Sequence, residues 1–278
     1  MARSRASEVL PPSKLRERKR KKRIILSTLL GVFILCLCGG VLYAMHDDAV
    51  RIRDVIVEGA QTIPPGDLET SVHETLEGSW WYIIPKNSAL VYSGKKITTR
   101  ILETFPKVKT ARVSLENLHT VRLTLSERSP TALWCGVESG TAGSELHPCY
   151  FLDEGGFAYE EAADFSGSAY VRWYGQISSD TPPAHFLSRD VFHALHALVG
   201  ALGGGDYTPV RVVITPERDV KVSFEENFDL LFTVAQKPED VLMRLRTAQV
   251  SDVLAGKKLS DLQYLDLRFG NRLYYTFK

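Results

Sequence analysis

The sequence lacks the short motifs that mark common classes of enzyme and nucleotide-binding protein. It contains no G-x-S-x-G, no P-loop and no G-x-G-x-x-G. His73-Glu74 begins like the zinc motif H-E-x-x-H, but Glu77 stands where the second histidine is needed. Residues Ser93–Lys96 match S-x-x-K, yet neither S-D-N nor K-T-G accompanies them. These absences favour a non-catalytic protein without a cofactor or a metal ion.

Charge is missing from Ile24–Met45, a run of 22 residues. As a helix at about 1.5 Å per residue it spans roughly 33 Å, which matches the ~30 Å hydrocarbon core of a bilayer. A cleaved signal peptide would have a shorter apolar core, and Leu42 stands where a small residue is required for cleavage after Ala44. A lipoprotein signal would need a small residue before Cys36 or Cys38, and both follow leucine. We therefore expect one transmembrane helix at residues 24–45.

Positive charge is concentrated ahead of this run. Residues 1–23 hold ten Lys or Arg and two Glu, which is +8, so the other 255 residues carry −7 against an overall +1. The basic block ends at Arg23, so the positive-inside rule places residues 1–23 in the cytoplasm as a tail and the bulk outside. The acidic remainder argues against a nucleic-acid binder.

The four cysteines are expected in two settings. Cys36 and Cys38 lie in the apolar run and should act as small apolar side chains. Cys135 and Cys149 flank a glycine-containing segment outside the membrane, where a disulfide is permitted. Such a bridge would contribute about 3 kcal/mol by restricting the unfolded chain. Two half-buried thiols are the alternative.

Residues 50–128 indicate the order strand, helix, helix, strand, strand. The first strand is expected at 51–59, and an aromatic loop at 79–87 separates the helices. Apolar residues at helical spacing mark the two helices: Leu68, Val72 and Leu76, then Ile97, Ile101, Leu102 and Phe105. Residues 111–115 and 121–126 alternate as two strands joined by a turn at 116–119. A three-stranded sheet covered on one face by two helices satisfies this pattern.

Residues 129–278 indicate a mostly antiparallel β-domain with flanking helices, so the expected fold class is α+β. A hairpin is expected around Asp153–Gly156. One helix should run from Ser188 to Leu202, stopped by glycines 203–205, and another from Pro238 to about Leu254. Further strands are expected at 210–215, 219–224, 229–234, 262–269 and 272–277. His185, His193 and His196 lack a cysteine or carboxylate partner, so we expect packed or surface histidines rather than metal ligands.

Two runs of sequence resemble a known family. Residues 127–132 read Glu-Arg-x-Pro-x-Ala, and residues 265–269 read LDLRF before a Gly-Asn turn and a last aromatic strand. In this order after a membrane anchor, they resemble the FtsQ/DivIB family of bacterial cell-division proteins. The resemblance implies a POTRA domain at 50–128, an FtsQ-like β-domain at 129–278 and a place at the division septum. It also implies FtsB- and FtsL-like bitopic partners at the C-terminal β-region, and other division proteins at the POTRA domain.

The last strand is expected at a sheet edge because the chain ends on it. Alternation would place Leu273, Tyr275 and Phe277 on one face. An exposed edge favours addition of a partner strand, whereas a well-covered terminal strand would not. Together with the resemblance, this predicts partner binding by Arg268, Asn271, Arg272, Leu273, Tyr274, Tyr275 and Thr276.

The sequence thus predicts a non-catalytic division scaffold that spans the cell membrane once. One alternative is a membrane-anchored cell-wall enzyme, which would need a nucleophile or a metal constellation; the S-x-x-K match places the test of this alternative at Ser93. The other is a POTRA-bearing component of protein translocation, against which the lack of a C-terminal membrane-barrel pattern counts.

Overall fold

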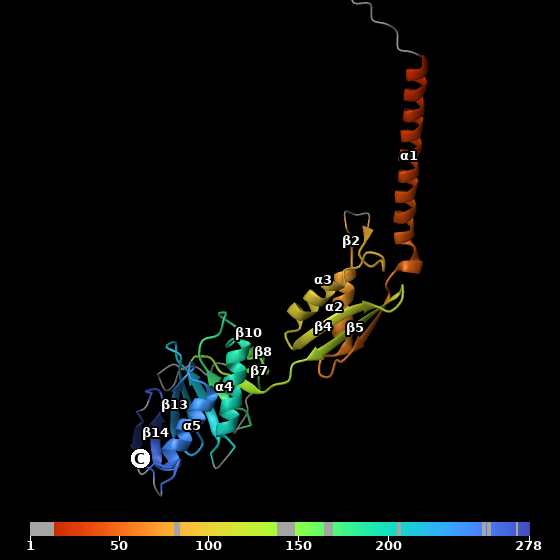
Figure 1. The fold of residues 1–278 in the computed structure, drawn as a ribbon. Coiled ribbons are helices and arrows are strands. Elements are labelled where there is room, and N and C mark those ends of the chain that lie inside the picture. The colour runs from red at the N-terminus through yellow and green to blue at the C-terminus, as the bar shows by residue number, and fades with distance from the viewer. Residues whose placement is uncertain are drawn as a thin grey trace, which may run out of the picture. The chain divides into compact units, whose positions relative to one another are not determined.

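The computed structural model describes residues 14–80, 84–137, 148–163, 169–204, 207–251, 254, 257–270 and 272–278 (Figure 1). Two compact units make up the chain, Met1–Leu102 with Ala111–Leu125 and Glu103–Thr110 with Ser126–Lys278. A three-stranded sheet belongs mainly to the first unit, and a ten-stranded sheet belongs to the second. Beyond the first helix the chain is therefore α+β, as predicted.

The first helix, α1 (Lys14–His46), is longer than the predicted span. Its residues Lys21–His46 form one helix that is long and apolar enough to cross a membrane. The helix also takes in the end of the basic tail, because Lys, Arg and Glu are good helix formers. A short 3-10 helix at Asp48–Val50 follows. Residues 1–13 of the predicted tail lie outside the described residues.

The next elements follow in the predicted order of strand, helix, helix, strand and strand. They are β1 (Asp54–Glu58), α2 (Pro65–Leu76), α3 (Gly94–Thr104), β4 (Val108–Leu115) and β5 (Thr120–Glu127). A hairpin of β2 (Ser79–Trp80) and β3 (Ile84–Pro85) lies between the helices, within the expected aromatic loop, of which 81–83 are not described. In the sheet β5 lies between β4 and β1, and it runs parallel to β1.

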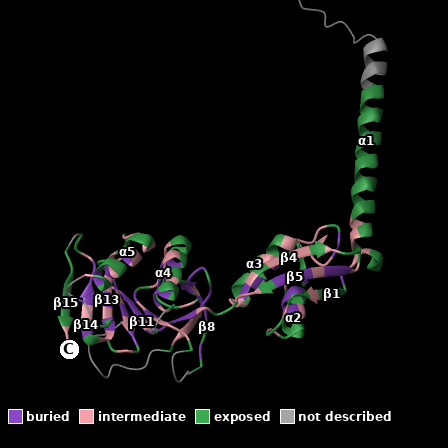
Figure 2. Ribbon diagram, turned by 60° about the horizontal axis from the view of Figure 1, so that its bottom comes forward, coloured by how far each residue is buried: buried purple, intermediate pink, exposed green. Residues whose placement is uncertain are grey.

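One face of this sheet is buried because its strands alternate. Val121, Leu123 and Leu125 of β5 are buried (Figure 2). The helices supply the other half of this core with the residues predicted from their spacing: Leu68, Val72 and Leu76 of α2, and Ile97 and Ile101 of α3. The opposite face is polar, and there Arg122 pairs with Glu58. A single buried face is what two covering helices require.

The second unit is built on one wide sheet with two helices. Its strands are β6 (Ala132–Trp134), β7 (Tyr150–Leu152), β8 (Phe157–Glu161), β9 (Arg172–Tyr174), β10 (Ala184–His185), β11 (Pro209–Ile214), β12 (Asp219–Phe224), β13 (Asp229–Thr233), β14 (Leu262–Asp266) and β15 (Tyr274–Phe277). The order across the sheet is β10-β8-β7-β6-β9-β11-β12-β13-β14-β15. Most neighbours run antiparallel, as predicted, whereas β6–β9, β9–β11 and β13–β14 are parallel.

The predicted boundaries hold best where the pattern is long. The β7–β8 hairpin turns at residues 153–156, and β12 has its predicted bounds. The helix α4 (Arg189–Leu202) begins after Ser188, although the Ser188 side chain makes no capping hydrogen bond. The helix α5 (Pro238–Gln249) ends before the predicted Leu254, and residue 205 of the predicted helix stop is not described. Strands β6, β9 and β10 were not predicted, because two or three residues carry no periodic signal.

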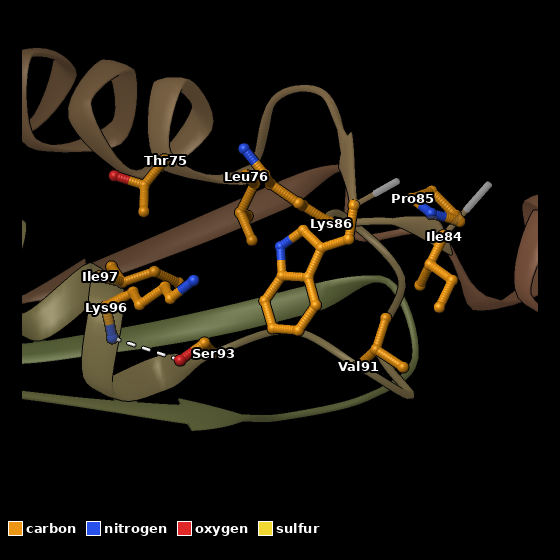
Figure 3. Close-up of a pocket in the computed structure, with 10 residues that line it drawn as sticks. Thr75, Leu76, Ile84, Pro85, Lys86, Val91, Ser93, Lys96 and Ile97 are labelled. Atoms are coloured by element: carbon orange, nitrogen blue, oxygen red, sulfur yellow. Dashed lines mark hydrogen bonds between the residues drawn. The ribbon is translucent and has the colours of Figure 1, made fainter. Parts of the chain in front are cut away.

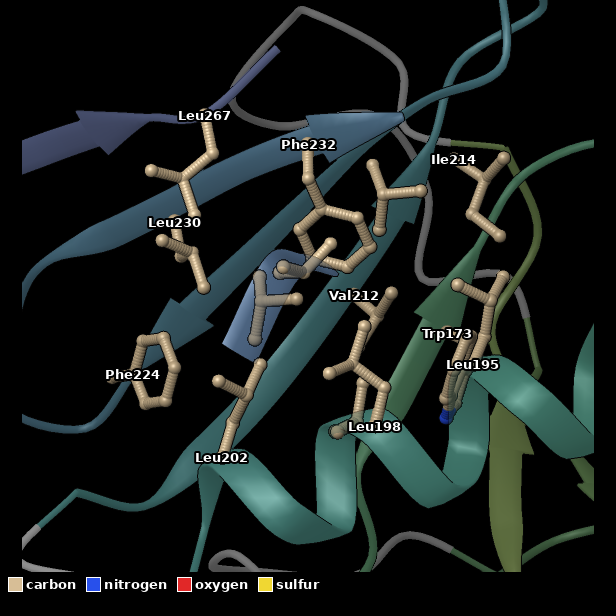
Figure 4. Close-up of a cluster of buried hydrophobic side chains, with 14 of the residues drawn as sticks. Trp173, Leu195, Leu198, Leu202, Val212, Ile214, Phe224, Leu230, Phe232 and Leu267 are labelled. Carbon is tan, nitrogen blue, oxygen red and sulfur yellow. The ribbon is translucent and has the colours of Figure 1, made fainter. Parts of the chain in front are cut away.

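A single apolar core fills the space between the ten-stranded sheet and its helices. α4 and α5 lie side by side, and both contribute buried residues to the same cluster as the inward side chains of the sheet. Trp173, Phe192 and Phe232 are its largest fully buried side chains, and Figure 4 shows Trp173 and Phe232 among leucines of α4. Burial of such a side chain contributes about 1.5–3 kcal/mol. This core fixes β13 and β14, on which the last strand rests.

Two contacts, a disulfide and an ion pair, fasten the β6–β8 side of the sheet. Cys135 and Cys149 form a disulfide that joins the end of β6 to the start of β7; residues 138–147 between them are not described. Arg128 pairs with Asp153, whose side chain is only 3% exposed. Asp153 also accepts hydrogen bonds from the N–H groups of Gly155 at 2.8 Å and Phe157 at 3.0 Å. The arginine of the Glu-Arg-x-Pro-x-Ala run therefore holds the β7–β8 turn.

Candidate partner-binding edge

The last strand, β15, forms one edge of the ten-stranded sheet. It pairs antiparallel with β14, and the structure describes no strand beyond it. Its side chains are open to solvent: Tyr274 and Tyr275 are 45% and 39% exposed, and Leu273 just before the strand is 37% exposed. Large apolar and aromatic side chains on an open edge are uncommon in a stable monomer, because they invite association.

The backbone of β15 divides its hydrogen-bonding groups between two sides. The Lys278 N–H donates to the Asp261 carbonyl at 3.1 Å, toward β14. In an antiparallel pair the backbone groups of alternate residues point to opposite sides. Thr276 and Tyr274 therefore direct their groups to β14, whereas Tyr275 and Phe277 direct theirs to the open edge. An added strand would find these groups ready to pair.

The end of the chain is held in place from two directions. The Phe277 ring packs against the core, and the Lys257 ammonium lies 3.7 Å from the centre of that ring. The Lys278 ammonium donates to the carbonyls of Ser260 at 2.7 Å and Glu226 at 3.0 Å. The strand is thus fixed at one end while its outer edge stays uncovered among the described residues. Such a fixed edge lowers the entropy cost of adding a partner strand.

The LDLRF run has a clear structural role at the start of the turn between β14 and β15. Arg268 donates to both carboxylate oxygens of Asp266 and pairs with Asp219 of β12. The hydrogen bonds that Arg268 donates to Asp266 come first among the effects that raise the pKa of Arg268 above its usual value. The Leu267 carbonyl accepts hydrogen bonds from Gln236 and Arg244. These contacts end β14 at Asp266, three residues earlier than predicted.

The predicted partner-binding residues therefore separate into two groups. Arg268 is half-buried, pairs with Asp266 and Asp219, and positions the turn that leads to β15. The others that the structure describes are exposed along the edge: Arg272, Leu273, Tyr274, Tyr275 and Thr276. Asn271 lies outside the described residues. The structure thus brings the exposed members together on one strand and the segment just before it.

Sequence reasoning missed a second exposed apolar surface, which lies on α5. Met243 is 60% and Val250 is 84% exposed. They line a shallow hollow of about 440 Å³ with Leu242 and Arg246. The signal was present, since Val241 and Ala248 are buried seven residues apart and Met243 and Val250 repeat that spacing on another side of the helix.

Ser93 acts as a helix cap. Its Oγ accepts the Lys96 backbone N–H at 3.4 Å, and its carbonyl accepts the Ile97 N–H at the start of α3 (Figure 3). The Lys96 ammonium lies 4.4 Å from the centre of the Trp80 ring. The adjoining cavity of about 20 Å³ has room for roughly one water molecule. The S-x-x-K spacing therefore has a capping explanation.

Two of the three histidines noted in the sequence, His185 and His196, are packed against aromatic rings, and His193 is exposed. His185 lies 5.0 Å from Phe157, and His196 lies 5.6 Å from Phe192, between ring centres. Burial lowers the pKa of His196, so its neutral form is favoured. No group of three or more His, Cys, Asp or Glu side chains in the described part of the chain could hold a metal ion.

Comparison with known protein families and with curated protein sequences found no match to this chain.

Proposed function

We propose that this chain is a non-catalytic scaffold of the bacterial division machinery. α1 anchors it once in the cell membrane, with the basic tail in the cytoplasm and the residues after α1 outside, at the division septum. Its first unit corresponds to a POTRA domain and its second to an FtsQ-like β-domain. The element order after the anchor and the resemblance of residues 127–132 and 265–269 to the FtsQ/DivIB family support this proposal.

The open edge of β15 is the observation that carries the proposal. A small membrane-anchored partner, of the FtsB or FtsL kind, would add a strand to the outward backbone groups of Tyr275 and Phe277. Each new hydrogen bond contributes about 0.5–1.5 kcal/mol, and the exposed Tyr274 and Tyr275 add apolar contact. Confinement of both proteins to one bilayer raises their effective concentration. The scaffold thereby links division proteins and helps to control septal peptidoglycan synthesis.

The sharpest test is Tyr275→Pro in the full-length chain. Proline removes the N–H that faces the open edge but leaves the bonds of Tyr274 and Thr276 to β14, so the edge itself should remain folded. Loss of one backbone bond and the bulk of the ring should weaken binding at least about tenfold. Binding would be measured by co-purification and titration with the FtsB-like protein of the same organism.

Tyr275→Val is the matched control, because it also removes the tyrosine ring but keeps the N–H. We expect it to bind several-fold more tightly than the proline variant. Equal binding by the two variants would show that strand addition is wrong. If the unmodified chain fails to bind any FtsB-like protein, the division role itself is wrong. Deletion of residues 271–278 is a coarser test, because it also removes Phe277 from the core.

A further inference from the structure

One end of the first unit is formed by segments that are hydrogen-bonded to residues 50–53, which follow α1 closely in the sequence. The Ile52 N–H donates to the Asn87 carbonyl, and the Ala89 N–H donates to the Val50 carbonyl, each at 2.8 Å. The Arg53 N–H donates to the His119 carbonyl, also at 2.8 Å. Segments 87–89 and 117–119 are thus fixed to residues 50–53. α1 ends at His46, four residues before Val50. Four residues of chain extend at most about 14 Å.

The exposed apolar side chains of the first unit gather at this end. Outside α1, the described residues of that unit include five large exposed apolar side chains: Ile56, Trp80, Leu90, Leu102 and Leu118. Leu90 follows segment 87–89 directly, and Leu118 lies within 117–119. Trp80 pairs with Ile84 in the hairpin whose second strand leads into residue 87. Three of the five are therefore near the exit of α1, whereas Leu102 lies in the last turn of α3, at the other end of the unit.

The same end carries three lysines, and it includes the first turn of α3 because the Lys96 ammonium lies 4.4 Å from the centre of the Trp80 ring. Lys86 follows β3, and Lys95 and Lys96 occupy the first turn of α3, where the helix dipole adds positive potential. None of these three lysines forms an ion pair within the part of the chain that the structure describes. The nearby Asp48 is already paired with Arg51 at 3.1 Å and Arg53 at 3.4 Å. This end therefore combines apolar side chains with unpaired positive charge.

We propose that this end, the entry rim of Trp80, Lys86, Leu90, Lys95, Lys96 and Leu118, docks on an anionic bilayer surface. The inference rests on the proposed anchoring by α1. Tryptophan and leucine enter the headgroup layer, which is about 5–7 Å deep on each side of the hydrocarbon core, and the lysines pair with lipid phosphates. A membrane is the partner that fits, because Val50 follows the helix end by at most about 14 Å of chain, and segments 87–89 and 117–119 are hydrogen-bonded to residues 50–53.

Site-specific spin labelling of the full-length chain in vesicles tests the rim. Cys36 and Cys38 are the free cysteines and would be replaced by alanine. A nitroxide is then placed at Leu90→Cys or, as the matched control, at Leu102→Cys; these leucines are 55% and 38% exposed. Vesicles contain phosphatidylcholine alone or with phosphatidylglycerol. The measurement is the accessibility of the nitroxide to a neutral, water-soluble nickel complex.

In anionic vesicles we expect the label at residue 90 to be several-fold less accessible than the label at residue 102. A lysine near an anionic surface contributes about fivefold to the docked-to-undocked ratio. Lys95→Gln and Lys96→Gln should therefore each lower that ratio about fivefold while the near-ultraviolet circular dichroism stays unchanged. Removal of phosphatidylglycerol from the vesicles should also lower the docked-to-undocked ratio.

Flotation of the same vesicles separates the two ways in which the inference can fail. A chain that floats with the vesicles, yet is equally accessible at residues 90 and 102, would overturn the entry rim and leave the anchor standing. A chain that does not float would overturn the anchor, and the rim with it.

Discussion

At one edge of the ten-stranded sheet lies β10, and at the other lies β15. β10 is two residues long and follows Pro182–Pro183, and the His185 carbonyl accepts the Ser178 N–H at 2.9 Å. β15 has four residues, contains no proline and has no strand beyond it among the described residues. Short strands and nearby prolines are devices that protect an edge from pairing with other chains. β10 has both devices and β15 has neither.

The two sides of the sheet are also fastened differently. The β6–β8 side has the disulfide and the Arg128–Asp153 pair, in which the side chains are 16% and 3% exposed. The β14–β15 side depends on Arg268, which is 27% exposed and pairs with Asp266 and Asp219. The protected edge therefore belongs to the more strongly fastened side. This difference is expected if β15 is kept open to receive a partner strand, because a binding edge must pair readily while the rest stays folded.

The largest expected effect is at Asp153, on the fastened side. Asp153→Ala leaves the Arg128 guanidinium without its partner and removes the acceptor of two backbone N–H groups. The free energy of unfolding of the second unit should fall by about 3–5 kcal/mol, measured by urea denaturation. The neighbouring Glu154 is 64% exposed and forms a surface ion pair with Lys109, so Glu154→Ala should cause a much smaller change. Equal effects of the two substitutions would contradict the assignment of Asp153 as a fastening.

Loss of the disulfide should have a somewhat smaller effect on the same side. Replacement of Cys135 and Cys149 by alanine releases a bridge between residues 14 apart in sequence. The free energy of unfolding should fall by about 3 kcal/mol, because the unfolded chain regains the freedom of that loop. Reduction of the unmodified chain should reproduce the loss and leave the double variant unchanged. Partner binding at β15 should persist, and its loss would mean that the two sides are not independent.

The smallest expected effect is at Arg268, on the open side. Arg268→Ala removes charge-assisted hydrogen bonds to Asp266 and Asp219, at a cost of about 1–3 kcal/mol, less than at Asp153 because these groups are more exposed. Hydrogen exchange of the β14 and β15 amides should rise, and Arg268→Lys should restore part of the protection. Arg272→Ala, at an exposed position, is the control and should leave exchange unchanged. If Arg272→Ala raised hydrogen exchange more than Arg268→Ala, Arg268 would be assigned to the partner contact instead of the turn.

Long periodic segments of this fold could be predicted from the sequence, and short ones could not. The apolar stripes of α2 and α3 and the alternation of β12 are repeated over several residues, so local pattern alone identifies them. β9 has three residues and lies between β6 and β11, both distant in sequence. Its place depends on the burial of Trp173 in a core formed by many segments. Local pattern cannot contain that information.

The candidate site divides in the same way. The alternation of the last strand and its aromatic residues are visible in sequence. The direction of the Arg268 side chain cannot be read from the sequence, because its partner Asp219 lies 49 residues away. In the sequence, Ser93 likewise resembles part of a catalytic motif. In the structure, its Oγ accepts the Lys96 N–H at the start of α3.

The sequence by itself determined the membrane-length helix, the basic block ahead of it and the order of the longer strands and helices, because these follow from hydrophobicity, charge and periodicity over neighbouring residues. Only the tertiary structure decided that β10 is protected while β15 is open, that Arg268 braces a turn, and that Trp80, Leu90 and Leu118 share one end of the first unit. These properties depend on which distant segments pack together. That choice is made by burial of the whole core and by long-range hydrogen bonds.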